Sequence, residues 1–140
     1  MGGVMTTPTV LPHVDAVQAA LTGAGLTVYL GGTPTNAGWS PPGQFAVLYP
    51  DPGTASRASL AGERTDFQHL VQVTCVGATV ERALWVADKV RKALDKPLTV
   101  EGRKAWQPED QGGPPVQRDD DVTPPLFFVP VQYLIQSIPS

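Results

Sequence analysis

The stretch "DFQHLVQVTCVGATVERALWVADKVRKAL", from Asp66 to Leu94, carries the most regular pattern in the chain. From Asp66 to Val76, β-branched and aromatic residues recur with the period of two that predicts a β-strand. Gly77 ends that run in a tight turn. From Thr79 to Leu94, apolar residues recur every three or four positions, which predicts an amphipathic helix. A strand followed by a tight turn and a helix lays the helix against the sheet, so this stretch decides the fold.

Working outward, the same patterns predict one further helix and five further strands. Pro and Gly, at 15 and 14 of 140 residues, cluster in long loops between them. The sequence therefore predicts an α+β fold: a mostly antiparallel sheet with two helices packed on one face, and long Pro/Gly-rich loops. Pro130 lacks an amide donor, which predicts a sheet edge or bulge there. The predicted helix is 12–22, the strands are 27–30, 44–49, 99–106, 116–121 (paired with the last strand) and 126–138, and the loops are 31–43, 51–66 and 107–115.

Length and charge restrict the class of protein. The chain fits a single domain, residues 1–140, with a flexible N-terminus at 1–9. A net charge of −3 argues against a general nucleic-acid binder, which needs a basic patch. No apolar run approaches the roughly 20 residues of a membrane span. A single cysteine favours a reducing compartment. Charged residues make up only 16%, which favours burial of surface against other subunits.

Cys75 and His69 are the residues of the opening stretch with reactive side chains. They share one face of the strand but lie six residues apart, roughly 20 Å at about 3.3 Å per residue. A nucleophile and its base need hydrogen-bond reach, roughly 3 Å. Cys75 also ends an apolar row, where a cysteine behaves as a small hydrophobe. His13 approaches Cys75 only if the fold brings it there, and nothing in the sequence supports that.

Other signatures of chemistry do not occur. The turn at Gly77 has neither a dinucleotide-binding nor a phosphate-loop pattern. No cluster has metal-ligand spacing, and no Gly-x-Ser-x-Gly motif is present. Three consecutive acidic residues, Asp119, Asp120 and Asp121, alternate in direction along an extended segment and so do not converge on a metal. They are interpreted as a solvated turn. The sequence predicts no enzyme, no catalytic residue, no metal and no cofactor.

Trp85 is the feature of the second helix that its pattern does not explain. At about 100° per residue, Trp85 falls opposite the apolar stripe, among Glu81, Lys89 and Lys92. It either lies over lysine stems or makes a second buried contact against another subunit or partner; the sequence leaves both open. The predicted stripe comprises Val80, Ala83, Leu84, Ala87, Val90 and Leu94, with Val86 beside it.

The strand "FQHLVQVTCVG" and the helix "ATVERALWVADKVRKAL" together resemble the tail terminator proteins of long-tailed bacteriophages, which are related to minor tail and tail-completion proteins. A first helix with "VQAALTGAG" before a strand, and an apolar strand near the end of the chain, fit the same family. The order of helices and strands resembles that of the family over most of the chain, whereas the specific sequence similarity covers about its middle fifth. The helix positions that match the pattern typical of the family are Ala83, Ala87, Asp88, Val90, Arg91 and Leu94.

The resemblance implies a structural virion protein that forms a ring, usually a hexamer, at the head-proximal end of the tail tube. Such a ring stops tube polymerisation and joins the tube to the head connector. The implied partners are further copies of the chain, the major tail tube protein and a head-completion or connector protein, with assembly in the host cytoplasm. DNA would pass through the lumen without specific binding, and no membrane is involved.

The resemblance also suggests where contacts lie. Trp85, Lys89 and Lys92 would contact a neighbour, and the loop 51–66 would be an arm whose Arg57 and Arg64 meet acidic partners. Asp119, Asp120 and Asp121 would face the lumen, where negative charge repels phosphate. Two alternatives remain: another head–tail connector or neck protein, and a small thiol enzyme that uses Cys75.

Overall fold

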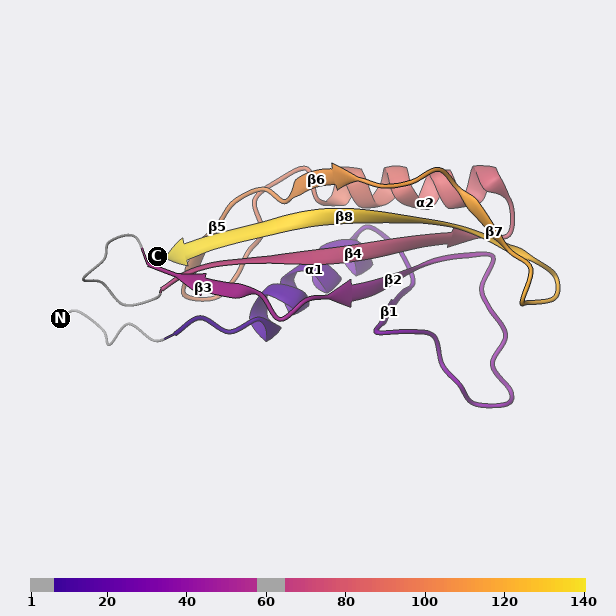
Figure 1. The fold of residues 1–140 in the computed structure, drawn as a ribbon, viewed down its shortest axis with the longest axis horizontal. Coiled ribbons are helices and arrows are strands. Elements are labelled where there is room, and N and C mark those ends of the chain that lie inside the picture. Colours follow the sequence, from indigo (N-terminus) through magenta and orange to yellow (C-terminus); the bar gives the residue numbers. More distant parts are fainter. Residues whose placement is uncertain (1–6, 58–64) are drawn as a thin grey trace.

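Two long antiparallel strands, β4 (Asp66–Gly77) and β8 (Leu126–Pro139), form the centre of the structure. The structure is a computed structural model that describes residues 7–57 and 65–140. Strands β4 and β8 are paired from Phe67 opposite Ser137 to Gly77 opposite Phe127. Figure 1 shows them running side by side along the whole length of the molecule. They carry the strongest strand patterns in the sequence, and their pairing makes one continuous platform.

The remaining strands extend this platform on both sides. Strand β2 (Gln44–Pro50) pairs antiparallel with β4, and β1 (Val28–Leu30) pairs parallel with β2. Strand β3 (Thr54–Ser56) continues the same edge of β4. Strands β5 (Arg103–Ala105), β6 (Glu109–Gly112) and β7 (Gln117–Asp119) each pair antiparallel with β8. The predicted α+β class with a mostly antiparallel sheet is confirmed.

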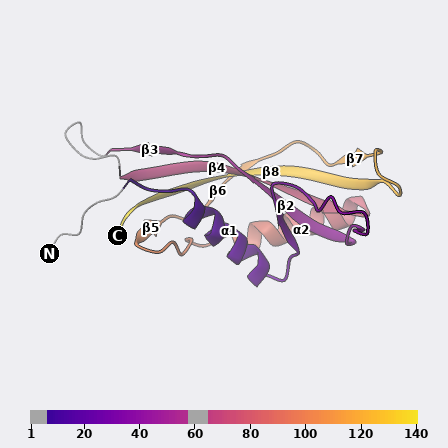
Figure 2. The same ribbon diagram turned by 90° about the horizontal axis from the view of Figure 1, so that it is seen from below.

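Both helices, α1 (Leu11–Gly23) and α2 (Val80–Ala93), cover the same face of the sheet, as Figure 2 shows. On that face β4 contributes the row that the alternation predicted, and every member of the row is buried. Each valine so buried contributes about 1.5–3 kcal/mol relative to exposure. The row is Phe67, His69, Val71, Val73 and Cys75.

The strand–turn–helix predicted from the opening stretch is confirmed, with Thr79 as N-cap. Its hydroxyl accepts a hydrogen bond from the Arg82 amide at 3.2 Å, and Glu81 lies in the positive first turn of α2. Gly77 lets the strand end approach the helix closely, because a Cβ there would lie 2.4 Å from the Ala83 nitrogen. The turn therefore needs a glycine to bring α2 back onto the sheet.

The apolar stripe of α2 differs from the prediction at three positions. Val80 and Leu84 are 39% and 46% exposed, whereas Val86 is fully buried. The helix is turned about its axis so that Ala83 and Ala87 face the sheet. The buried side of α2 is made by Ala83, Val86, Ala87 and Val90, and Val80 and Leu84 lie at its edge, where they stay partly exposed.

Two predicted loops contain short strands. Strand β3 lies within 51–66 and β6 lies within 107–115, so the loop assignment was wrong there. Their sequences, "TAS" and "EDQG", have no strand pattern; they are extended because the free edges of β4 and β8 offer hydrogen-bond partners. The pairing of 116–121 with the last strand is confirmed by β7. Pro130 lies where β7 has ended, at Phe128, and β6 has not begun, at Gln132, so the predicted edge is confirmed.

Candidate functional site

Cys75 is buried in the core and has no features of a nucleophile. Its side chain is completely buried, and its sulfur donates to the Val73 carbonyl at 3.7 Å. Burial raises the pKa of the thiol to about 12, so the thiolate is not populated near neutral pH. The interpretation of Cys75 as a small hydrophobe agrees with this setting, which argues against the thiol-enzyme alternative.

The two histidines meet at the other end of the sheet, in a cluster that sequence reasoning missed. His13 of α1 and His69 of β4 have ring centroids 5.9 Å apart, in an edge-on arrangement. His13 donates through Nδ1 to the Thr9 carbonyl at 2.8 Å, and its Nε2 accepts from the Ser137 hydroxyl at 2.7 Å. This neutral form ties the start of α1 to the end of β8. The sequence offers no signal for it, since these residues are distant in the chain.

Burial governs the charge of the histidine cluster. It lowers the pKa of His69 to about 4 and also lowers the pKa of His13. His69 is 2% exposed, and its Nδ1 lies 3.9 Å from Oδ1 of Asp51. The positively charged guanidinium of Arg103 lies beside the cluster, where its Nε donates a hydrogen bond to the Ser137 hydroxyl at 2.9 Å. The cluster is therefore a neutral packing element at pH 7, next to a fixed cation.

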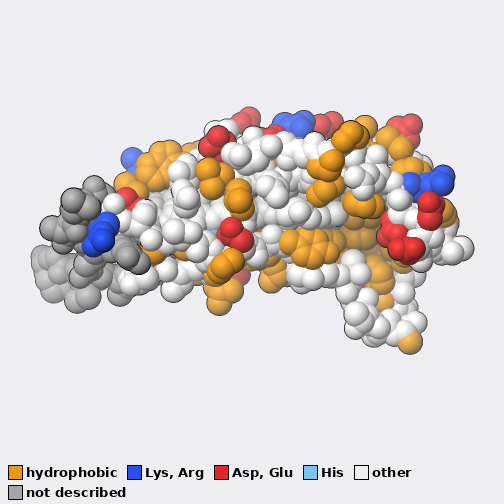
Figure 3. Space-filling view, in the orientation of Figure 1, with side chains coloured by type: hydrophobic (Ala, Val, Ile, Leu, Met, Phe, Trp, Pro, Cys, Tyr) orange, Lys and Arg blue, Asp and Glu red, His pale blue; other side chains and the backbone are white. Residues whose placement is uncertain are grey.

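The sheet surface away from the helices, termed the helix-free face, is built from the alternate side chains of β2, β4 and β8. Strand register places these side chains in rows across the sheet. Asp66, at the start of β4, shares this alternation, and none of the others is charged. Figure 3 shows mostly uncharged surface on this face, with an acidic group near its middle and most other charged groups toward the rim. A charge-depleted, partly aromatic surface is typical of the centre of a protein interface. Its members are Phe45, Val47, Tyr49, Gln68, Leu70, Gln72, Thr74, Val76, Phe128, Pro130, Gln132, Leu134 and Gln136.

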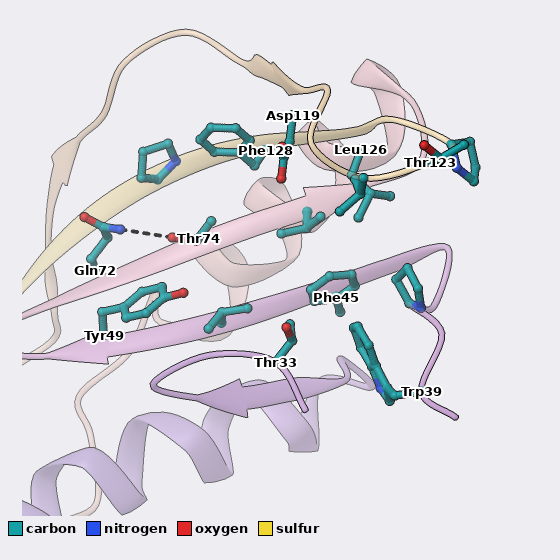
Figure 4. A pocket seen from close by; sticks show the side chains of 16 residues that line it. Thr33, Trp39, Phe45, Tyr49, Gln72, Thr74, Asp119, Thr123, Leu126 and Phe128 are labelled. Atoms are coloured by element: carbon teal, nitrogen blue, oxygen red, sulfur yellow. Dashed lines mark hydrogen bonds between the residues drawn. The ribbon is translucent and has the colours of Figure 1, made fainter. Parts of the chain in front are cut away.

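One end of the helix-free face is hollowed into an apolar groove of about 670 Å³. Its floor is formed by Phe45, Val47 and Val76, with Phe128 packed beside them. Figure 4 shows these strands below the opening, with Trp39 on one side and Asp119 and Thr123 on the other. The Trp39 ring stands edge-on to Phe45, with centroids 6.4 Å apart. The loop 31–43 and the segment that joins β7 to β8 therefore form the two walls.

The acidic run lies in the second wall. Asp119 lines the groove, and its carboxylate accepts a hydrogen bond from the Asp121 amide at 3.0 Å. Arg118 pairs with Asp120 at 2.7 Å in an exposed setting. One arginine and three aspartates give the segment from Arg118 to Asp121 a net charge of −2. The acidic run therefore borders an apolar groove, and the sequence did not predict that the two lie side by side.

The exposed side of α2 faces away from the sheet and carries Trp85. The Lys89 ammonium lies 5.3 Å from the centroid of the Trp85 ring, which fits the reading of a tryptophan over a lysine. That contact still leaves the residue 43% exposed. Lys92 is exposed one turn further on, and Arg57 is exposed after β3, whereas Arg64 lies outside the described residues. The structure brings Trp85, Lys89 and Lys92 together and leaves Arg57 apart from them.

Within residues 7–57 and 65–140, no group of three or more His, Cys, Asp or Glu side chains is arranged to hold a metal ion. Neither helix of the described chain is long and apolar enough to cross a membrane.

Comparison with known proteins supports the fold. No family model matches the sequence, and no curated protein matches it. Among solved structures, a chain from the "Virion of native gene transfer agent (GTA) particle" is 17% identical and aligns over 91% of this chain and 88% of its own, with a TM-score of 0.53. A second solved chain is 19% identical over 89% of this chain and 94% of its own, but its TM-score of 0.49 is too low to support an argument. At this identity the first likeness shows a shared fold.

Proposed function

We propose that the protein is a structural virion protein: a tail terminator that forms a ring, a hexamer by the family resemblance, at the head-proximal end of a phage-like tail tube. One observation carries the proposal. The sequence of the strand–turn–helix from Asp66 to Leu94 resembles that of tail terminators. This unit lies at the centre of a fold that is shared, over nearly the whole chain, with a chain from a gene transfer agent virion. The sequence resemblance and the shared fold therefore point to the same class of particle.

The surface chemistry supports an assembly role. Apart from Asp66, the side chains of the helix-free face are uncharged, and the outer side of α2 exposes the ring of Trp85. Cys75 is buried, and burial raises the pKa of its thiol to about 12. The partners proposed are further copies of the chain, the major tail tube protein and a head-completion or connector protein.

The experiment that tests the proposal combines a tube assay with electron microscopy. The purified protein is added to polymerising major tail tube protein from the same virus, and tube length is measured. A terminator shortens tubes in proportion to its concentration, and a gold-labelled chain decorates one end. Label on the head side of the neck in intact particles would instead support the head–tail connector alternative and refute the terminator role. Unchanged tube length with no end label would refute the terminator role, and absence of label from the neck of intact particles as well would refute both.

A further inference from the structure

The groove on the helix-free face and the Trp85 side of α2 lie on opposite sides of the same chain. Helix α2 packs on the sheet through Ala83, Val86 and Val90, so Trp85 points away from it. The groove opens on the other surface of the sheet, as Figure 4 shows with α2 behind the strands. One chain cannot fill its own groove with its own Trp85, because the sheet lies between them.

The two surfaces match in apolar chemistry. The groove is floored by Phe45 and Val76 and flanked by Phe128, all aliphatic or aromatic. Trp85 offers a ring that is 43% exposed, with Leu84 beside it at 46%. A tryptophan buries about 150–250 Å² when it enters such a site, and its flat ring packs well against other aromatic rings.

The two surfaces also match in charge. Helix α2 carries Arg82, Lys89, Arg91 and Lys92 against Glu81 and Asp88, so its net charge is +2. The wall from Arg118 to Asp121 has a net charge of −2. Lys89 and Lys92 are placed beside Trp85, as the acidic wall is placed beside the groove. A contact that inserts the ring into the groove brings the lysines to the carboxylates.

We propose that the apolar groove is the docking site for a second copy of this chain, which inserts Trp85 while its Lys89 and Lys92 contact the acidic wall. The contact is head-to-tail, because the groove and Trp85 lie on opposite sides of the chain and so meet two different neighbours. Repetition of such a contact closes into a ring when the rotation between copies closes, and otherwise continues as a filament. Closure into a ring rests on the proposed function; the contact itself does not.

Charge reversal tests the contact. One variant carries Lys89→Glu and Lys92→Glu, and the other carries Asp120→Lys and Asp121→Lys. Asp119 is kept because its carboxylate holds the Asp121 amide. Sedimentation velocity measures assembly. Each variant alone is expected to be monomeric, since like charges then meet. An equimolar mixture is expected to assemble again, because each reversed surface finds its complement. A protein that had merely unfolded would not be rescued by mixing.

Two further variants complete the test. Trp85→Ala is expected to weaken self-association by roughly thirtyfold, the loss of a central aromatic anchor. The matched control carries Glu101→Lys and Lys104→Glu, two exposed residues near β5, and is expected to assemble as the unmodified protein does.

The outcomes separate the contact from the proposed function. If the unmodified chain is monomeric, or if both charge reversals assemble normally, the contact is refuted. Loss of assembly in the lysine variant alone would indicate a contact between two α2 helices and would also refute it. Rescue by mixing, together with no effect on tail tubes, would support the contact and refute the terminator role.

Discussion

Protonation of the buried histidine cluster is expected to make the protein unstable in mild acid. His69 has an ordinary pKa of 6.5 that burial lowers to about 4 in the folded state. The unfolded chain therefore binds a proton that the folded chain does not bind between these two values. The contribution of neutral His69 to the free energy of unfolding is fully present above pH 6.5 and is lost as the pH falls toward 4.

The size of the effect follows from the two pKa values. With 6.5 in the unfolded chain and about 4 in the folded chain, linkage gives a loss of about 2 kcal/mol between pH 7.5 and pH 5. His13, whose pKa is also lowered, acts in the same direction. These are the only two histidines of the sequence, so histidine titration in this pH range comes from the cluster.

Urea unfolding followed by tryptophan fluorescence at pH 7.5 and pH 5 measures the loss. His69→Leu fills the site with an apolar side chain that does not titrate, so its free energy of unfolding should fall by about 2 kcal/mol less than that of the unmodified protein over this interval. His13→Gln is the control: it retains His69, so it should keep the part of the pH dependence that comes from His69. An equal loss in His69→Leu and the unmodified protein would show that His69 does not titrate as its burial requires.

Three further predictions concern the opening strand, turn and helix. Gly77→Ala places a Cβ 2.4 Å from the Ala83 nitrogen and should lower the free energy of unfolding by about 1–3 kcal/mol; Gly23→Ala, whose Cβ would meet nothing within 4 Å, is the control and should be neutral or stabilising. Thr79→Ala removes the cap of α2 and should cost about 1 kcal/mol in urea unfolding, whereas Thr99→Ala at an exposed position should not. Cys75 should react with a thiol reagent only as fast as the protein unfolds, and rapid labelling of the folded protein would contradict its burial.

Patterns of local origin were predicted well. The long strand, the glycine turn and the capped helix between Asp66 and Leu94 follow from periodicity and from the chemistry of Gly77 and Thr79, which act over a few residues. The short strands β3 and β6 were not predicted, because their residues become extended only where β4 and β8 present unpaired edges. The rotation of α2 was also missed at Leu84, since helical spacing identifies an apolar side but not which part of it the sheet will cover.

The candidate surfaces divide in the same way. Trp85 was identified from the sequence because helical geometry alone puts it opposite the buried side. The groove was not, because its floor comes from β2, β4 and β8 and its walls from two distant loops, which only tertiary structure brings together. The same holds for His13 and His69, which are far apart in the chain and meet in the core.

The sequence alone was enough to predict the long strands and both helices, the buried position of Cys75 and the outward position of Trp85, because each depends on alternation or helical period within one segment. Tertiary structure decided that a largely uncharged sheet face ends in a groove beside Asp119, and that this groove lies on the side of the sheet opposite Trp85. Strand pairing and register across the sheet set both, and no local pattern encodes them.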